Sequence, residues 1–358
     1  MKLFECQKCG QQLYFQNTVC ESCGSALGYL PERTVLSALE GGDGGGWHPL
    51  AAPGERWRFC ANAQHQACNW MIPADAADQL CRACRFNRTI PDLDDQEHLI
   101  LWQRIEAAKH RLIYSLMRLG LPLIDKNQDA DAGLAFDVLA DDAPSFRDRP
   151  GVMTGHAEGL ITLNLKEADD ALREQARSDM DEPYRTLLGH FRHEIGHYYW
   201  ERLVRNAPSL ELFRILFGDE RADYGASLER HHTAGAPADW PAGFVSAYAS
   251  AHPWEDFAES FAHYLHIVDT LETASALRFR VAPRAGRDPA LSADVDTDPY
   301  QESDFDALLA AWLPVTYAVN SLNQSMGQPD LYPFVLAAPA IDKLRFIHDL
   351  LRKAAARA

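Results

Sequence analysis

The sequence contains no long apolar run and no surplus of positive charge. No stretch comes near the roughly 18 consecutive apolar residues that a membrane-spanning helix needs. The first ten residues, MKLFECQKCG, lack the apolar core of a secretory signal. The formal net charge of -17 argues against a protein that binds nucleic acid through its whole surface. We therefore expect a cytoplasmic protein that associates with neither membranes nor nucleic acid.

Cysteine is absent after residue 84. All eight cysteines lie in residues 1–90, and that segment balances eight Lys or Arg against eight Asp or Glu, so the remainder carries the whole net charge of -17. Cysteine content and charge thus change at the same place. The chain, with 358 residues, is long enough for two domains. The composition predicts a cysteine-rich region over residues 1–93 and a second domain over residues 94–358.

The first four cysteines form two pairs with a two-residue gap, Cys6 with Cys9 and Cys20 with Cys23. Such a gap lets both thiolates of a pair face one metal ion, and two pairs complete a tetrahedral four-cysteine site. The short loop between the pairs is typical of a zinc ribbon. Two disulfides are the weaker alternative, because nothing marks the chain as secreted. We predict a structural zinc ion here.

The second four cysteines are less regular, with seven residues between Cys60 and Cys68 and two between Cys81 and Cys84. We predict a second structural zinc site held by all four; in the alternative, Cys60 or Cys68 is a buried free thiol. Residues 41–46, between the two sets, have the glycine-rich composition of a flexible linker. Zinc sites replace a hydrophobic core that a segment of about 40 residues cannot build. The ribbons also offer a surface to a protein partner.

Residues 94–358 show helical and strand patterns in turn. Apolar residues recur at helical spacing from the start of this segment, and Gly120 ends the run. Helical patterns also dominate the C-terminal half. Between them lie three short strand patterns, at residues 134–139, 152–156 and 160–165. We predict an α+β fold, with zinc ribbons before a mainly helical domain that contains a small, mostly antiparallel sheet. The last of the three strands is either an ordinary strand or an edge that pairs with an extended peptide.

The segment LLGHFRHEIGHYYWERLV (residues 187–204) contains His193, Glu194 and His197 in the pattern His-Glu-x-x-His. Residues four apart share one face of a helix, so both imidazoles can bind one zinc ion. Glu194 stands beside the first histidine, where it can accept a proton from zinc-bound water and pass it to the leaving group. In the alternative, the two histidines are ordinary helix residues. The pattern predicts a catalytic zinc site.

A catalytic zinc ion usually keeps three protein ligands and an open position for water. A third histidine six residues after the second is excluded, because Leu203 occupies that position. A carboxylate from a later helix remains, and Glu255 and Glu259 face the same way, one helical turn apart. One of them would bind zinc while the other accepts the N–H of a ligand imidazole. Three further carboxylates compete for the role of ligand: Asp219, Glu220 and Asp223.

These residues together resemble the gluzincin metallopeptidases. The resemblance implies that Glu255 is the third zinc ligand and that Glu259 orients a ligand imidazole. The whole chain also resembles a bacterial family of zinc-binding metallopeptidases with an N-terminal zinc ribbon. The matching stretches are CRACRFNRTIPDL (81–93), FRHEIGHYYW (191–200), WEDFAESFAHY (254–264) and MGQPDLYPFVL (326–336). This family implies a zincin-like domain that hydrolyses peptides or proteins, with Glu194 as the general base, one catalytic zinc ion and two structural ones.

The oxyanion of the tetrahedral intermediate needs a hydrogen-bond donor besides zinc. The sequence does not choose among six candidates: Tyr224, His231, His232, His263, Tyr264 and Tyr317. Two other functions are compatible with the same pattern, hydrolysis of a different amide and a protein-interaction module whose zinc site is vestigial. The intact histidines and Glu194 argue against a vestigial site.

Overall fold

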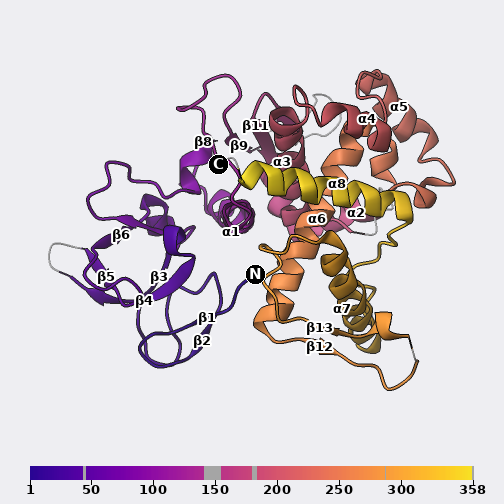
Figure 1. The fold of residues 1–358 in the computed structure, drawn as a ribbon. Helices are drawn as coiled ribbons and strands as arrows, with labels where there is room; N and C mark the ends of the chain where they lie inside the picture. Colours follow the sequence, from indigo (N-terminus) through magenta and orange to yellow (C-terminus); the bar gives the residue numbers. More distant parts are fainter. Residues whose placement is uncertain (43–45, 141–154, 180–183, 287, 357–358) are drawn as a thin grey trace. The chain divides into compact units, whose positions relative to one another are not determined.

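The computed structural model describes residues 1–42, 46–140, 155–179, 184–286 and 288–356, and they form two compact units. Unit 1 comprises residues 1–114 and 124–173, and unit 2 comprises residues 115–123 and 174–358. The long helix α1 (Gln96–Arg118), labelled in Figure 1, begins in unit 1 and ends in unit 2. The boundary predicted at residue 93 lies inside unit 1. None of the helices that the structure describes is long and apolar enough to cross a membrane.

The first part of unit 1 contains two antiparallel sheets. β1 (Phe4–Glu5) pairs with β2 (Gln12–Leu13). The larger sheet has the order β3-β4-β5-β6-β7 and consists of β3 (Leu27–Leu30), β4 (Val35–Gly41), β5 (Trp47–Pro49), β6 (Trp57–Phe59) and β7 (Met71–Pro73). Its core contains Leu30, Leu39, Trp57 and Met71. Gly28 lets this core close, because a Cβ at that position would lie 2.1 Å from the Met71 sulfur.

The glycine-rich stretch that we predicted as a linker connects two paired strands of this sheet. β4 ends at Gly41, β5 begins at Trp47, and the two strands are antiparallel neighbours. The Gly42 N–H donates to the Gly46 carbonyl at 2.9 Å. Residues 43–45 lie outside the described part of the chain. The described residues on either side of 43–45 therefore belong to one sheet.

A further sheet of unit 1, β10-β11-β9-β8, is mixed, and our prediction of a mostly antiparallel sheet is wrong. Its order is β10-β11-β9-β8, with β8 (Asn87–Thr89), β9 (Ala135–Leu139), β10 (Gly155–Ala157) and β11 (Leu160–Asn164). The β8–β9 and β9–β11 pairs are parallel, and only β10–β11 is antiparallel. The reason is the long connection between β8 and β9, which contains α1 and allows a parallel return. Part of the strand predicted at residues 152–156 lies outside the described residues.

β11 lies inside this sheet. It pairs with β9 along its whole length and with β10 over Leu160–Thr162. The interpretation of β11 as a free edge for a peptide is therefore wrong. Two ion pairs lie at the β8 side of the sheet. Arg85, just before β8, binds Asp125, and Arg88 of β8 binds Asp137 of β9.

Unit 2 is mainly helical, so the α+β fold class is confirmed. Its helices are α3 (Leu187–Leu203), α4 (Leu210–Phe217), α5 (Tyr224–Ala234), α6 (Pro253–Ala276), α7 (Phe305–Ser325) and α8 (Ala338–Ala355). α2 (Asp170–Asp179) spans the change from unit 1 to unit 2. A two-stranded sheet pairs β12 (Arg280–Val281) with β13 (Ala293–Asp294). Helix α6 lies at the centre of the unit, because its side chains are buried along most of its length and it contacts α3, α4, α7 and α8.

The close packing of α3 on α6 positions the residues of interest. Gly196 permits it, because a Cβ at that position would lie 2.9 Å from the Ala258 Cα. Local signals fix both helix starts. The Thr186 side chain accepts the Gly189 N–H at 2.9 Å and caps α3. Pro253 occupies the first turn of α6, as predicted.

A buried ionic network also ties α3 to α6. Arg192, the residue before His193, forms an ion pair with Asp269 of α6, and both side chains are buried. The Asp269 carboxylate also accepts hydrogen bonds from Ser115 Oγ, at 3.0 Å, and from the Tyr300 hydroxyl. Because loss of one partner would leave a buried charge, this network resists any change in the register of the two helices.

Candidate metal centres

His193, His197 and Glu255 come together between α3 and α6, each with one ligand atom within 4.8 Å of the others. The Nε2 atoms of the two histidines are 3.2 Å apart. Oε2 of Glu255 lies 3.0 Å from His193 Nε2 and 3.5 Å from His197 Nε2. Ligands at zinc bond lengths in a tetrahedral site are separated by roughly 3.3 Å. The three atoms therefore fit around one zinc ion.

The chemistry of the Glu255 carboxylate favours a cation at this place. Glu255 is 1% exposed, and no hydrogen bond to its Oε2 is found among the described residues. Burial alone would raise the pKa of Glu255, but His197 and His193 outweigh burial and hold this pKa well below its usual range. The buried carboxylate is thus kept charged opposite two imidazoles. A divalent cation would satisfy all three groups at once.

Glu259 contacts the other side of His193. Its Oε1 lies 2.7 Å from His193 Nδ1, and its Oε2 accepts a hydrogen bond from Ser246 Oγ at 2.6 Å. Burial opposes ionisation, but the hydrogen bond and the charge of His193 lower the pKa of Glu259 to about 2. This contact directs the Nε2 lone pair of His193 toward His197 and Glu255. Glu259 is therefore placed to orient a ligand.

Glu194 is half-buried on α3 next to His193. The charge of Glu194 interacts electrostatically with two tyrosines, Tyr224 and Tyr248. Burial, followed by Glu255 and more weakly by Glu194, raises the pKa of both phenols. The Tyr224 hydroxyl donates to Glu255 Oε1 at 2.7 Å. Tyr248 packs its ring 5.8 Å from the His193 ring. Both phenols therefore stay protonated and can act as donors.

Sequence reasoning missed Tyr248 and Trp254. Tyr248 lies in a short 3₁₀ turn (Tyr248–Ser250) before α6, where no local pattern marks a functional residue. The Trp254 ring lies 4.7 Å from the His197 ring and 5.7 Å from the Tyr224 ring, so it forms an apolar side of the site. Its position directly before Glu255 was the only signal that could have revealed it.

The other predicted donors differ in their surroundings. His263 Nδ1 is hydrogen-bonded to the Tyr332 hydroxyl at 2.6 Å, and the Tyr264 hydroxyl is hydrogen-bonded to His348 Nδ1 at 3.0 Å. Each of these two candidates therefore already has a partner away from the zinc-binding group. Tyr317 is 57% exposed on α7. His231 lies near the site, with its ring edge-on to that of Tyr248 at 5.7 Å, and His232 follows it on α5.

The competing carboxylates are not part of the group around the two histidines. Asp219 forms an ion pair with Arg221, and Glu220 forms one with Arg214. Asp223 accepts the Ala226 N–H at 2.9 Å and caps α5. Each carboxylate thus has a local partner, which the sequence pattern alone could not show.

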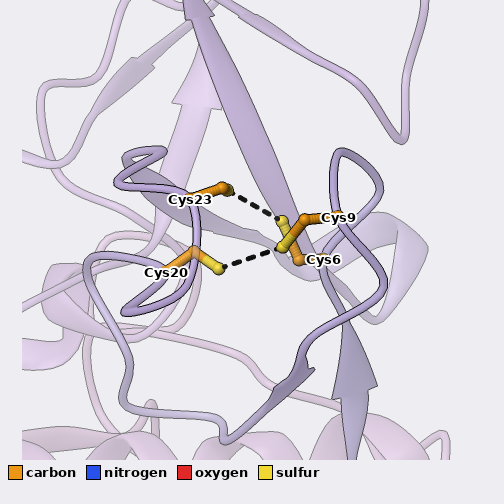
Figure 2. Close-up of side chains that lie close together, drawn as sticks. All are labelled: Cys6, Cys9, Cys20 and Cys23. Carbon is orange, nitrogen blue, oxygen red and sulfur yellow. Dashed lines mark hydrogen bonds between the residues drawn. The ribbon is translucent and has the colours of Figure 1, made fainter.

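The first four cysteines form a compact group, shown in Figure 2. The sulfur atoms pair across the two loops, Cys6 with Cys23 at 3.7 Å and Cys9 with Cys20 at 3.6 Å. A disulfide would require about 2.05 Å, whereas thiolates around one zinc ion are about 3.8 Å apart. All eight cysteines are free. The group therefore fits a structural zinc ion.

The second four cysteines also come together, and all are buried. The Cys68 and Cys81 sulfurs are 3.7 Å apart. Backbone N–H groups of Cys81 and Cys84 donate to the sulfurs of Cys60, at 3.2 Å, and Cys81, at 3.4 Å. Such bonds stabilise thiolates. The seven-residue gap between Cys60 and Cys68 is therefore compatible with one group of four sulfurs. Both cysteines belong to this group with Cys81 and Cys84.

Comparison with known proteins agrees with this geometry. Residues 98–350 match a family described as "Putative zinc-binding metallo-peptidase", and residues 3–95 match a family described as "zinc-ribbon domain". A protein of Mycobacterium tuberculosis and one of Mycobacterium bovis, both named as uncharacterized, are 44% identical to the chain over 356 residues. The alignment covers 99% of this chain and 96% of each relative. No solved structure matches.

Proposed function

The chain belongs to the zinc-binding metallo-peptidase family, and from this membership we propose that it hydrolyses peptide bonds with a zinc-activated water. The observation that carries the proposal is the convergence of His193, His197 and Glu255 on one point, with a charged, buried carboxylate oxygen that faces both imidazoles. These three residues would hold the zinc ion. When bound, zinc lowers the pKa of a water molecule and polarises the substrate carbonyl.

Glu194 acts as the general base in this proposal. It follows a zinc-binding histidine in the first half of α3, and its carboxylate takes the proton of the attacking water. The same carboxylate then returns the proton to the leaving amine, so that the peptide bond breaks without a charged amide nitrogen as the leaving group. Its half-buried position keeps it accessible to water while limiting the solvation of its charge.

Glu259 is a positioning residue. It accepts a hydrogen bond from the outer nitrogen of His193 and is itself held by Ser246. This arrangement leaves His193 in the tautomer whose Nε2 binds metal, and it restrains rotation of the ring.

Two tyrosines have different roles in the proposed mechanism. Tyr224 donates to Glu255 Oε1, which leaves Oε2 to face the histidines. The Tyr248 hydroxyl makes no hydrogen bond to the described residues and lies within the electrostatic reach of Glu194, Glu255 and Glu259. We assign it the role of donor to the substrate oxygen as negative charge develops there.

A proteome-wide cleavage assay tests the proposal. Purified wild-type protein and Glu194→Gln are incubated with a denatured peptide library, and new N-termini are counted by mass spectrometry. Loss of the general base should reduce cleavage by roughly 10²–10⁴-fold while zinc content stays the same.

Two outcomes would contradict this assignment. Cleavage by Glu194→Gln within a factor of two of wild type would remove Glu194 from the mechanism. A wild-type enzyme with full zinc that cuts no peptide but hydrolyses small amides would favour a non-peptidase amidohydrolase. Binding of a protein partner through the zinc ribbons stays a separate prediction.

A further inference from the structure

His110, a buried residue of α1, lies against the second cysteine group. Its Nε2 is 3.2 Å from the Cys68 sulfur, 3.6 Å from Cys84 and 4.0 Å from Cys81. The residue is 4% exposed and belongs to unit 1 together with all four cysteines. It also lies outside residues 3–95, which match the zinc-ribbon family. The sequence spacing of the cysteines gave no hint of it.

The other nitrogen of His110 determines what Nε2 offers. Nδ1 lies 2.6 Å from the Glu106 backbone carbonyl, one helical turn earlier. A carbonyl oxygen only accepts, so Nδ1 carries the proton. In the neutral ring, Nε2 then has a lone pair that faces three sulfur atoms. That is the tautomer in which histidine binds a metal.

Buried contacts hold Glu106, the residue whose carbonyl accepts from His110. The Glu106 side chain is buried, forms an ion pair with Lys109 at 2.5 Å, and accepts the Asn87 side-chain N–H at 3.0 Å. Its backbone carbonyl therefore has little freedom to move away from His110. The Glu106 carbonyl, which sets the tautomer of the imidazole, is thus held in a buried environment.

The distances fit a tetrahedral metal site. A zinc ion with three sulfurs and one nitrogen separates nitrogen from sulfur by about 3.5 Å, close to the values for Cys68, Cys84 and Cys81. No contact of the same range joins His110 Nε2 to the Cys60 sulfur in the described part of the chain. His110 and Cys60 are therefore alternative fourth donors to the same three thiolates.

We propose that His110 is a fifth donor of the second metal centre and can replace Cys60 as a zinc ligand. The centre then holds its ion through four sulfurs or through three sulfurs and one imidazole. Loss of the Cys60 thiolate leaves a complete site, and the metal connects the ribbon to helix α1. Among the residues that the structure describes, no histidine belongs to the first cysteine cluster, so this cluster provides a control in the same chain.

Metal retention in full-length variants tests the proposal. Cys60→Ser, His110→Ala, the double variant and the control Cys9→Ser are loaded with zinc and titrated with a chromophoric chelator, and the same proteins are examined with Co²⁺. Cys60→Ser should keep its ion with the absorption of a three-sulfur, one-nitrogen cobalt site. Loss of an outer hydrogen bond to a ligand costs about 10–100-fold in metal affinity. Adding His110→Ala to Cys60→Ser should lower the zinc affinity of the second centre by more than that. Cys9→Ser should lose metal from the first centre.

Three results would overturn it. The first is release of metal from the second centre of Cys60→Ser as readily as from the first centre of Cys9→Ser. The second is zinc affinity in the double variant as high as in Cys60→Ser. The third uses the unaltered protein, in case the variants do not fold: ¹⁵N NMR of the zinc-loaded wild type should show His110 with a proton on Nδ1 alone. Protons on both nitrogens would mean that His110 only donates a hydrogen bond to the thiolates.

Discussion

Glu255 and Glu259 of α6 give a sharp test of the active-site geometry, because both contact His193 but at different nitrogens. Glu255 Oε2 lies 3.0 Å from Nε2, and Glu259 Oε1 lies 2.7 Å from Nδ1. The variants Glu255→Ala and Glu259→Ala make the same chemical change. The first removes the proposed metal ligand, and the second removes the group that we propose orients a ligand. Both replacements exchange Glu for Ala on the same helix, Glu255 in its first turn and Glu259 one turn later.

The expected magnitudes differ. Glu255→Ala removes one of three ligands and the only carboxylate of the group, so it should empty the catalytic site at micromolar free zinc. Glu259→Ala removes one hydrogen bond to a ligand, which costs about 10–100-fold in zinc affinity or activity. That range corresponds to about 1.4–2.8 kcal/mol. Glu259→Gln keeps an acceptor oxygen for His193 and should lose less than Glu259→Ala.

The assay is dialysis against zinc buffers, followed by elemental analysis and by cleavage of a confirmed peptide substrate. The two cysteine centres serve as an internal reference. Glu255→Ala should contain about two zinc ions per chain, and Glu259→Ala about three at saturating zinc with reduced turnover.

A reversed pattern, with Glu255→Ala filled and Glu259→Ala empty, would refute the assignment and mean that the two residues exchange roles. Wild-type affinity in both variants would refute it more completely. The ligand would then have to come from elsewhere, although the nearby Asp219, Glu220 and Asp223 each have another partner in the structure.

Three further predictions concern the metal content, the oxyanion donor and the helix contact. Wild-type protein should contain about three zinc ions per chain by elemental analysis, and a value of one would exclude the two cysteine centres. Tyr248→Phe should lower kcat by roughly 10²–10³-fold with zinc retained, whereas Tyr317→Phe on exposed α7 should leave kcat unchanged; equal kcat values for the two variants would exclude Tyr248 as the donor. Gly196→Ala should destabilise the protein by about 1–3 kcal/mol in denaturant unfolding, because its Cβ would lie 2.9 Å from the Ala258 Cα. Gly225→Ala in α5 is the control, because its Cβ would meet Asp223 Oδ1 at an ordinary 3.6 Å, and a loss of stability equal to that of Gly196→Ala would disprove the steric argument.

Features that depend on neighbours in the chain could be predicted from the sequence. The His-Glu-x-x-His spacing places His193 and His197 on one face of a helix, and the structure has them on α3 with Nε2 atoms 3.2 Å apart. The start of α6 at Pro253 follows from the fixed φ of proline. The first cysteine group followed from its two pairs, because a two-residue gap lets both thiolates of a pair face one metal ion. In the second group only Cys81 and Cys84 have this gap, and seven residues separate Cys60 from Cys68.

Features that depend on packing between distant segments required the tertiary structure. The contact of Glu255 with two histidines arises from the close approach of α3 and α6 at Gly196 and Ala258, more than 60 residues apart in the chain. The parallel pairing of β8 with β9 depends on the return of the chain after α1, which no strand pattern encodes.

The same reason explains why sequence reasoning missed Tyr248 and His110. Tyr248 reaches His193 only because the turn before α6 lies beside α3. His110 reaches the cysteines because α1 packs against the loops that carry Cys68, Cys81 and Cys84. A single tyrosine or histidine has no spacing partner nearby in the sequence. Its chemistry is determined by which distant side chains surround it once the chain has folded.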